Sequence, residues 1–490
     1  MADKPEDSRA MDEAPPAGKS VTRREFLKYA GIAGATVGLG GGLGGVLAAC
    51  GGTTTTTTAA TSPATTGTTA GTGTTAPSGT TTSVSSTAQQ GREVKIGWVT
   101  MTTGAFASLS EPDPFLLKQA KDAIGDGLVC ADNQKHPITW IVKDSQSDAN
   151  RAGQVAGDLI TGDKVDIVFA GMTPGITNPV SDQCEANGMP EVSYGSPWQA
   201  WYFRDATRAK DPTLGYKSVY HLFWGIEDLE AVYFALWDKI QTNKKVACLW
   251  ANDADGVATS DKATGFPPEM VKRGYQVINP GLFTNGTEDF SSLINQFKSQ
   301  GCEVLTVLAT PPDFANFWKQ AKQQAWNPKI ATIARAILVR PDMDAIGSIG
   351  QGLSNEVWWA STHPFKSSLT GFTCQQQADA WEKENNKGYN ASLGLTGGAF
   401  EVTIDAVKRT TNFDDPATII AAIKATDLQT ILGPIKFTGQ PVPNVCKTPL
   451  VGGQWVKGAK YSWDRLVTDN SNYPSIPTTG TEKPLSDFSV

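Results

Sequence analysis

From Arg92 onward, short apolar runs alternate with segments of helical spacing, and this alternation restricts the possible folds more than any other feature. The strand-like runs, and the helix-like segments that separate them, lie at 94–101, 114–124, 138–146, 151–160, 165–171, 178–188 and 190–196. Four strand–helix units within about 100 residues predict a parallel sheet whose strands are connected by helices.

The same pattern starts again after residue 221 and predicts a second lobe. Segment 227–240 places five apolar side chains on one helical face. Further strand-like runs lie at 244–253, 275–283, 303–310 and 329–337. Segments 400–409 and 415–426 are expected to return the chain to the first lobe. The predicted fold class is therefore α/β, with two Rossmann-like lobes built on parallel central sheets.

The stretch before this region reads TRREFLKYAGIAGATVGLGGGLGGVLAAC, from Thr22 to Cys50. Arg23 and Arg24, followed by a mild apolar run, resemble a twin-arginine export signal. The ending Leu-Ala-Ala-Cys resembles a bacterial lipobox, in which the cysteine, here Cys50, is lipidated and becomes the first residue. The alternative is an uncleaved N-terminal anchor helix. Both interpretations place the bulk of the chain outside the cytoplasm.

Residues 50–91 consist almost entirely of small and polar residues, and no charged residue interrupts them. Such a composition cannot bury enough apolar surface to fold, so it predicts a disordered tether. A threonine-rich stalk that carries O-linked sugars is an alternative, and both can hold together.

The net charge of −7 argues against nucleic acid as a partner. Beyond Cys50 there are six cysteines, an even number that permits disulfides in an exported chain. Cys374 with Cys446 is the pairing that we favour, and buried free thiols are the alternative. No C-x-x-C motif occurs and the three histidines lack metal-ligand spacing, so neither a metal nor a cofactor is expected.

Five segments together resemble the type I periplasmic binding proteins, most closely the Leu/Ile/Val-type receptors of branched-chain amino-acid ABC importers. They read VKIGWVTMTTGAFA, VKDSQSDANRA, VDIVFAGMTPGITNPVSDQCEANGMPEVSYGS, GTEDFSSLINQFKSQGCEVLTVLATPPDFANFWKQAKQQAW and LQTILGPIKFTGQ. The resemblance spans nearly all of residues 92–460. It implies two lobes joined by a hinge of three crossings, with a small solute bound between them.

The resemblance also implies which strand ends meet the solute. In the family, the loops that match MTPGIT and YGSP receive the ligand's carboxylate through hydroxyl and backbone N–H groups. The corresponding candidates here are Thr173, Gly175, Thr177, Gly195 and Ser196, with helix capping as the alternative role of Thr177. Pro174 stands where the family often has serine, which removes one donor.

The remaining candidates follow other strand ends or contribute aromatic surface: Thr103, Phe106, Tyr194, Trp198, Trp224, Asp255 and Thr310. Arg335 departs from the family pattern, because amino-acid receptors tend to place an acid near this point to hold the ligand's ammonium. An arginine instead suits a carboxylate, so an organic acid or an amide fits better than an ordinary amino acid. The alternative is a salt bridge on the lobe surface.

No nucleophile elbow, phosphate-binding loop or paired carboxylates occur in a recognisable frame, so we expect a binding protein and not an enzyme. The predicted function is a monomeric, lipid-anchored, extracytoplasmic receptor that delivers a small polar or acidic solute to an ABC permease. A ligand sensor for a signalling partner and a secreted hydrolase are the alternatives. The expected divisions are 1–49 signal peptide, 50–91 tether, 92–221 with 362–432 lobe 1, 222–361 with 433–475 lobe 2, and 476–490 tail.

Overall fold

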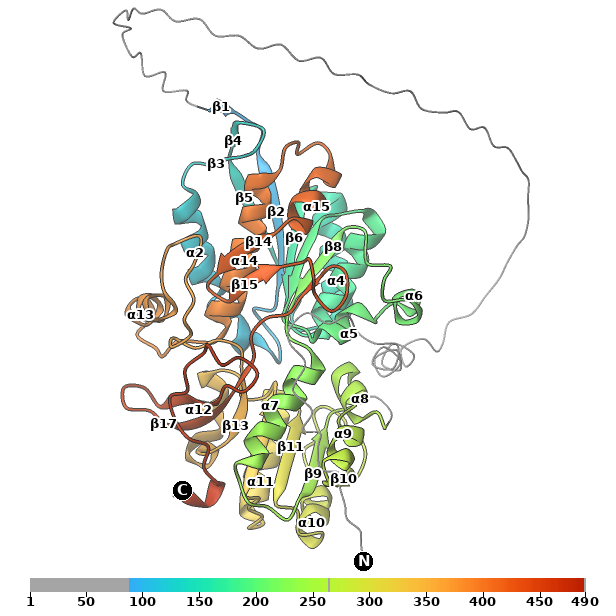
Figure 1. The fold of residues 1–490 in the computed structure, drawn as a ribbon, viewed down its shortest axis with the longest axis vertical. Coiled ribbons are helices and arrows are strands. Elements are labelled where there is room, and N and C mark those ends of the chain that lie inside the picture. Colours follow the sequence, from blue (N-terminus) through green and yellow to red (C-terminus); the bar gives the residue numbers. More distant parts are fainter. Residues whose placement is uncertain (1–87, 263–264, 489–490) are drawn as a thin grey trace, which may run out of the picture. The chain divides into compact units, whose positions relative to one another are not determined.

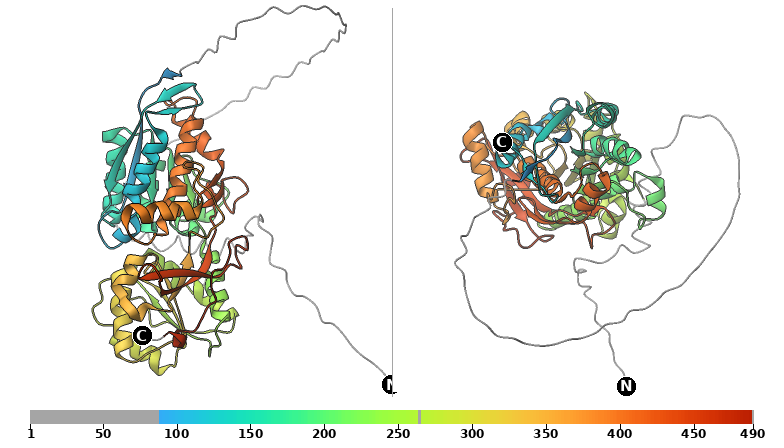
Figure 2. Two further views of the ribbon diagram at one scale, coloured as in Figure 1. Left: turned by 90° about the vertical axis from the view of Figure 1, so that its left-hand side faces the viewer. Right: turned by 90° about the horizontal axis from the view of Figure 1, so that it is seen from above.

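The computed structural model describes residues 88–262 and 265–488. The predicted signal with Arg23 and Arg24, the lipidated Cys50 and nearly all of the tether lie outside these ranges. Within them, no helix is long and apolar enough to cross a membrane. The described residues form two lobes, each with its own central sheet (Figures 1 and 2).

The sheet of lobe 1 has six strands, all paired in parallel. In spatial order they are β16 (Val445–Cys446), β8 (Val219–Leu222), β7 (Glu191–Tyr194), β6 (Ile167–Gly171), β2 (Val94–Thr100) and β5 (Ile138–Asp144). Its helices are α2 (Asp113–Ile124), α3 (Ala149–Gly157), α4 (Pro174–Asn187), α5 (Trp198–Tyr202), α6 (Ala206–Lys210), α13 (Cys374–Asn385), α14 (Ser392–Arg409) and α15 (Pro416–Lys424).

Short elements complete lobe 1. They are β1 (Gln89–Gln90), β3 (Leu128–Val129), β4 (Gln134–His136), β14 (Asp427–Thr430), β15 (Gly433–Lys436), a 3-10 turn at Ala107–Ser110 and a π-helical turn at Asp158–Asp163. Strand β1 pairs with β4, so ordered structure begins before Arg92, inside the segment expected to be tether.

The sheet of lobe 2 has seven strands. In spatial order they are β10 (Gln276–Ile278), β9 (Lys245–Trp250), β11 (Val304–Leu308), β12 (Ile330–Ala334), β13 (Ser354–Val357), β17 (Val451–Lys457) and β18 (Trp463–Asp469), the last two antiparallel. The other elements are α7 (Ile226–Asp238), α8 (Ala254–Ser260), α9 (Phe266–Lys272), α10 (Ser291–Ser299), α11 (Pro311–Gln323), α12 (Arg340–Ile346) and 3-10 turns at Gly347–Gly350 and Leu485–Asp487.

The ends of helix α4 and the burial of strand β6 agree with local signals in the sequence. Helix α4 begins with Pro174, whose ring suits a first helical turn, and it ends before Gly188, which takes a left-handed backbone with φ of 64°. Strand β6 is buried along its whole length, as expected for a parallel strand covered on both faces. The α/β prediction is confirmed, with parallel pairing predominating in both central sheets.

Three segments connect the lobes: 222–226, 357–374 and 446–451. The third lies later than predicted. We expected residues 433 onward to belong to lobe 2, but Val445 pairs with His221 on β8, and β15 pairs with β14, so both segments remain in lobe 1. Short strands separated by turns carry too little pattern to show which sheet they join, and this boundary was therefore misplaced.

Two further expectations need correction. The tail after residue 476 packs onto lobe 2, where Leu485 is buried and Glu482 accepts hydrogen bonds from Ser354 and Thr468. The cysteine pairing that we favoured is wrong in this structure, because all six cysteines of the described residues are buried free thiols. The Cys374 sulfur contacts the Ile431 carbonyl, whereas the Cys446 sulfur accepts from the Lys436 amide, so each thiol has its own partners.

Candidate functional site

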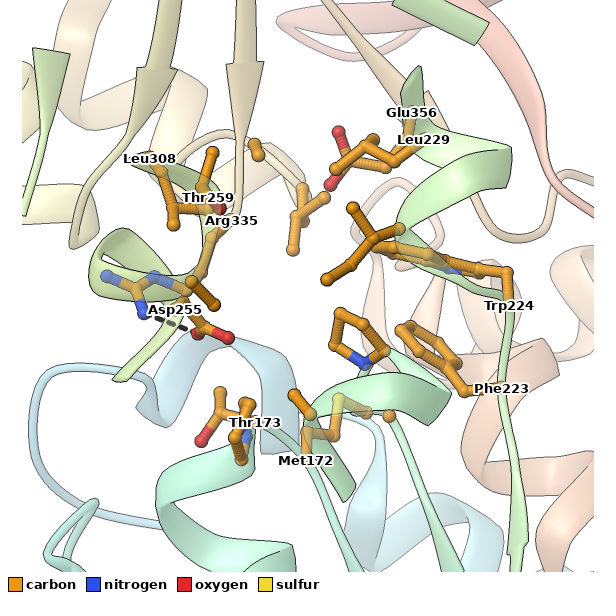
Figure 3. A pocket seen from close by; sticks show the side chains of 18 of the residues that line it. Met172, Thr173, Phe223, Trp224, Leu229, Asp255, Thr259, Leu308, Arg335 and Glu356 are labelled. Atoms are coloured by element: carbon orange, nitrogen blue, oxygen red, sulfur yellow. Dashed lines mark hydrogen bonds and ion pairs between the residues drawn. The ribbon is translucent and has the colours of Figure 1, made fainter. Parts of the chain in front are cut away.

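A cavity lies between the strand ends of the two lobes (Figure 3). It encloses about 670 Å³ of space not filled by atoms, part of which is continuous with solvent. Its walls are predominantly apolar, and they include Leu109, Met172, Pro174, Pro197, Ala200, Phe223, Trp224, Ile226, Leu229, Ala258, Phe266, Leu308, Ala334, Leu338 and Trp358.

Lobe 1 contributes the start of α4 to this cavity. Thr173, Pro174 and Gly195 line it, and they belong to the two loops of this lobe in which the sequence placed candidate residues. Thr173 has a φ of 65°, a left-handed conformation that is a genuine outlier for a β-branched residue. Such strain concentrates at ligand sites, where the surrounding structure holds it in place.

The opposite wall carries a charged cluster centred on Arg335, which also has a left-handed backbone, with φ of 68°. Its guanidinium donates to Asp255 at 2.8 Å, to Asp253 at 2.6 Å and to the Ala309 carbonyl at 3.3 Å. Burial raises the pKa of Asp255 to about 6, and the neighbouring charge of Asp253 adds to the rise, although Arg335 opposes it.

The contacts of Arg335 bear on the two roles that the sequence left open for it, a ligand clamp and a salt bridge. The side chain lines the cavity, so it is close to any bound solute, but it is also salt-bridged, with 10% of its side chain exposed. Each of its three nitrogens already donates a hydrogen bond, and two carboxylates offset its single charge. The guanidinium therefore contributes no uncompensated positive charge to the cavity.

Glu356, on β13, is a second acid in the wall (Figure 3). It is 1% exposed, and its Oε2 accepts a hydrogen bond from the Tyr233 hydroxyl of α7 at 2.6 Å. Burial raises the pKa of Glu356 to about 7, because desolvation outweighs the hydrogen bonds that favour the ionised form. The carboxyl is thus poised between its two protonation states near neutral pH.

Three aromatic rings adjoin the same part of the cavity. Phe223 and Trp224 lie on the first connection between the lobes and Trp358 on the second, and the ring centroids of Trp358 and Phe223 are 5.3 Å apart. The indole N–H groups of Trp224 and Trp358 are buried and have no hydrogen-bond partner among the described residues. Unsatisfied buried donors beside a cavity suit a solute with an acceptor.

Of the predicted site residues, the structure brings five together around the cavity: Thr173, Gly195, Trp224, Asp255 and Arg335. Phe106 lies next to them, because the Arg335 guanidinium sits over its ring at 5.4 Å from the centroid.

The other predicted residues have structural contacts elsewhere. The hydroxyls of Thr103, Thr177 and Thr310 bond Asp144, the Thr173 carbonyl and Asp313, respectively. Trp198 donates to Glu227, and Tyr194 stacks on Phe169 in the core. Gly175 lies in the first turn of α4, and Ser196 is buried near the Pro197 carbonyl, but neither lines the cavity.

Sequence reasoning missed Glu356, Trp358 and the apolar residues of α7 that line the cavity. Glu356 belongs to the run SNEVWWAS, where the single charge directly precedes the apolar residues Val357 to Ala360, and this is the one signal that could have marked it. Strand β13 was not predicted. The sequence therefore did not show that Glu356 lies near a strand end beside the second connection.

The comparisons identify the family. Residues 93–460 match the model of the periplasmic binding protein family, and the chain belongs to it. A curated relative is Leu/Ile/Val-binding protein homolog 3 of Brucella melitensis, 26% identical over 213 residues, which make up 43% of this chain and 49% of the relative. The alignment thus spans about half the length of that relative.

Solved structures of similar fold include a leucine-binding protein from Thermotoga maritima, with 17% identity, a TM-score of 0.61, and coverage of 77% of this chain and 99% of that chain. Another is a solute-binding protein from Rhodopseudomonas palustris in complex with 4-hydroxybenzoate, with 15% identity, a TM-score of 0.61, and coverage of 80% and 98%. At these identities the similarity shows a shared fold.

Proposed function

We propose that the chain is the solute receptor of an ABC importer, anchored outside the cytoplasm by a lipid on Cys50. It binds a small solute between its two lobes, closes on it and delivers it to a membrane permease without carrying out a reaction. The observation that carries this proposal is the cavity itself: strand ends of both lobes and two of the three connections line one predominantly apolar space.

The walls favour a solute with an apolar body. Fifteen of the lining residues are apolar, including the aromatic group on the first two connections. Burying apolar surface contributes about 25 cal/mol per Å², so a branched or aromatic solute would gain most of its affinity here. Relatives of this fold have been solved with isoleucine and with benzoate, which also carry apolar bodies.

A thermal-shift panel on the full chain tests this proposal. The panel contains leucine, isoleucine, benzoate, 4-hydroxybenzoate, the amines isoamylamine and benzylamine, and two sugars as polar controls. A solute that binds only the folded state stabilises that state, by about 2.7 kcal/mol when the solute concentration is 100 times Kd. This stabilisation raises Tm. We expect at least one apolar solute to raise Tm and the sugars to have no effect. A response confined to the sugars would contradict the proposed ligand class.

A separate prediction concerns the proposed lipid on Cys50. Changing Cys50 to Ser removes the thiol that would carry the lipid, so the variant is expected in the soluble extracytoplasmic fraction and without incorporated radiolabelled palmitate. Cys130, a buried free thiol in lobe 1, provides the matched control: Cys130→Ser should leave the protein lipid-labelled and membrane-bound. Membrane retention of Cys50→Ser would favour the uncleaved anchor helix instead.

A further inference from the structure

Among the described residues, no cationic side chain bonds to Glu356, an acid of the cavity wall. Its hydrogen bond comes from Tyr233, a neutral hydroxyl. Arg465, on β18, acts on it electrostatically but donates its own N–H groups to the carbonyls of Leu338 and Trp359. Asp255, the other acid in the wall, is by contrast paired with Arg335.

Among the described residues, the elements packed around Glu356 place no cationic side chain in hydrogen-bond contact with it. Helix α7 offers the Tyr233 hydroxyl, and the chain after β12 offers the backbone N–H of Arg335, whose guanidinium is held by the two aspartates. On β17 the residue opposite Glu356 is Gly452, which has no side chain to contribute. An ionised Glu356 is therefore a buried carboxylate stabilised by hydrogen bonds and by the charge of Arg465, which donates no hydrogen bond to it, and this state is costly unless a cation enters the cavity.

The rest of the cavity disfavours an anion and accommodates a cation. A carboxylate placed near Arg335 would meet a cluster in which two aspartates oppose one arginine. The three-ring group of Phe223, Trp224 and Trp358 adjoins the same space, and aromatic faces attract ammonium groups. The charged groups and the aromatic rings of the cavity wall therefore both favour a cationic solute over an anionic one.

We infer that Glu356 makes the cavity selective for an organic cation, an apolar body that carries a protonated amine. The inference rests on the receptor function proposed above and names the chemical class that this receptor takes. The amine donates to Glu356 and the apolar body fills the space lined by Leu229, Leu338 and Trp358.

Binding of such a solute is linked to pH. Because burial raises the pKa of Glu356 to about 7, the carboxyl is largely protonated at pH 6 and largely ionised at pH 8. A cation binds the ionised form and displaces the proton, so the affinity is expected to rise about tenfold from pH 6 to pH 8. Asp255 titrates lower, with a pKa of about 6, and contributes mainly below pH 7.

Calorimetric titration of the full chain tests the inference with three probes of the same shape: phenethylamine, phenethyl alcohol and phenylpropionate. We expect phenethylamine to bind tightest at pH 8, to lose about tenfold in affinity at pH 6, and to release a proton on binding. In Glu356→Gln, phenethylamine should lose this pH dependence and bind no better than phenethyl alcohol, because Gln keeps the shape and accepts the Tyr233 hydrogen bond without charge.

Two variants separate this role from a general effect on the fold. Tyr233→Phe removes the donor that favours the ionised form, so the pH at half-maximal affinity should move upward. Glu191→Gln is the matched control: Glu191 is a buried glutamate on β7 with a pKa raised to about 8, outside the cavity, and its replacement should leave the pH profile of binding unchanged.

The titration results show separately whether the role of Glu356 and the proposed receptor function hold. If phenylpropionate binds more tightly than phenethylamine, or if Glu356→Gln keeps the full pH dependence, the role of Glu356 is wrong while the receptor function stands. If none of the three probes binds, both the inference and the apolar ligand class are contradicted.

Discussion

Replacing Trp224 with alanine is expected to weaken solute binding by about 2 to 4 kcal/mol, or roughly 30- to 1,000-fold in Kd. Trp224 lies on the first connection between the lobes, is 4% exposed and lines the cavity beside Phe223, at 4.4 Å between ring centroids. Its loss removes apolar contact and an indole donor from the site together. Calorimetric titration with the best solute of the panel measures the change.

Trp381→Ala is the matched control, because a buried tryptophan is removed in both variants. Trp381 is 2% exposed in lobe 1, where its ring packs edge-on against Phe115 and its N–H donates to the Gly388 carbonyl, away from the cavity. This variant should lose stability, as large-to-small core changes do, and retain the wild-type Kd in its folded fraction. Equal loss of affinity in both variants would show that Trp224 acts only through the fold.

Replacing Glu191 with glutamine is expected to stabilise the protein at high pH. Both carboxyl oxygens of Glu191 are buried without a hydrogen-bond partner among the described residues. Burial raises the pKa of Glu191 to about 8, and the nearby Ser181 hydroxyl offsets the rise only in part. An ionised Glu191 is therefore a strongly destabilising group in the folded state.

The direction of the pH effect follows from the raised pKa. The protonated form of Glu191 favours folding fully below the unfolded pKa of about 4.5, and this contribution is lost as the pH rises through about 8. Glu191→Gln should equal wild type near pH 4.5 and exceed it by roughly 4 to 5 kcal/mol at pH 8 to 9, at about 1.4 kcal/mol per pKa unit. Denaturant unfolding at several pH values measures this.

Two comparisons make the stability prediction specific. Asp122→Asn changes an exposed carboxyl, 66% exposed on α2, and should leave the pH dependence as in wild type. Overlapping stability curves of Glu191→Gln and wild type from pH 5 to 9 would contradict the prediction. Other buried acids act in the same direction, because burial raises their pKa values to about 7: Asp113, Asp342, Glu401 and Glu482.

Much of the fold could be read from the sequence because the strands of a doubly covered parallel sheet are continuous apolar runs. Strands β2, β5, β6 and β7, and later β9, β11 and β12, lie within the predicted runs. Strand β13 was not predicted, because three of its four residues, Ser354, Asn355 and Glu356, are polar and give it no apolar run. The third connection was misplaced because β15 and β16 are short, and their sheet is decided by long-range pairing with β14 and β8.

The candidate site was predictable only in outline. Strand ends indicated Thr173, Gly195, Asp255 and Arg335, because ligands in such sheets bind beyond the carboxyl ends of strands. The sequence could not show that Asp253 and Asp255 occupy the Arg335 guanidinium, since this pairing joins residues about 80 positions apart. That contact changes the expected ligand, because it cancels the charge on which a carboxylate would depend.

A crystal structure of the chain with its most stabilising solute shows directly whether the cavity between the lobes is the binding site. We expect density for the solute between the lobes, in contact with Trp224, Trp358 and Thr173 and with its polar group toward Glu356. Density at another surface, with none in this cavity, would contradict this binding site.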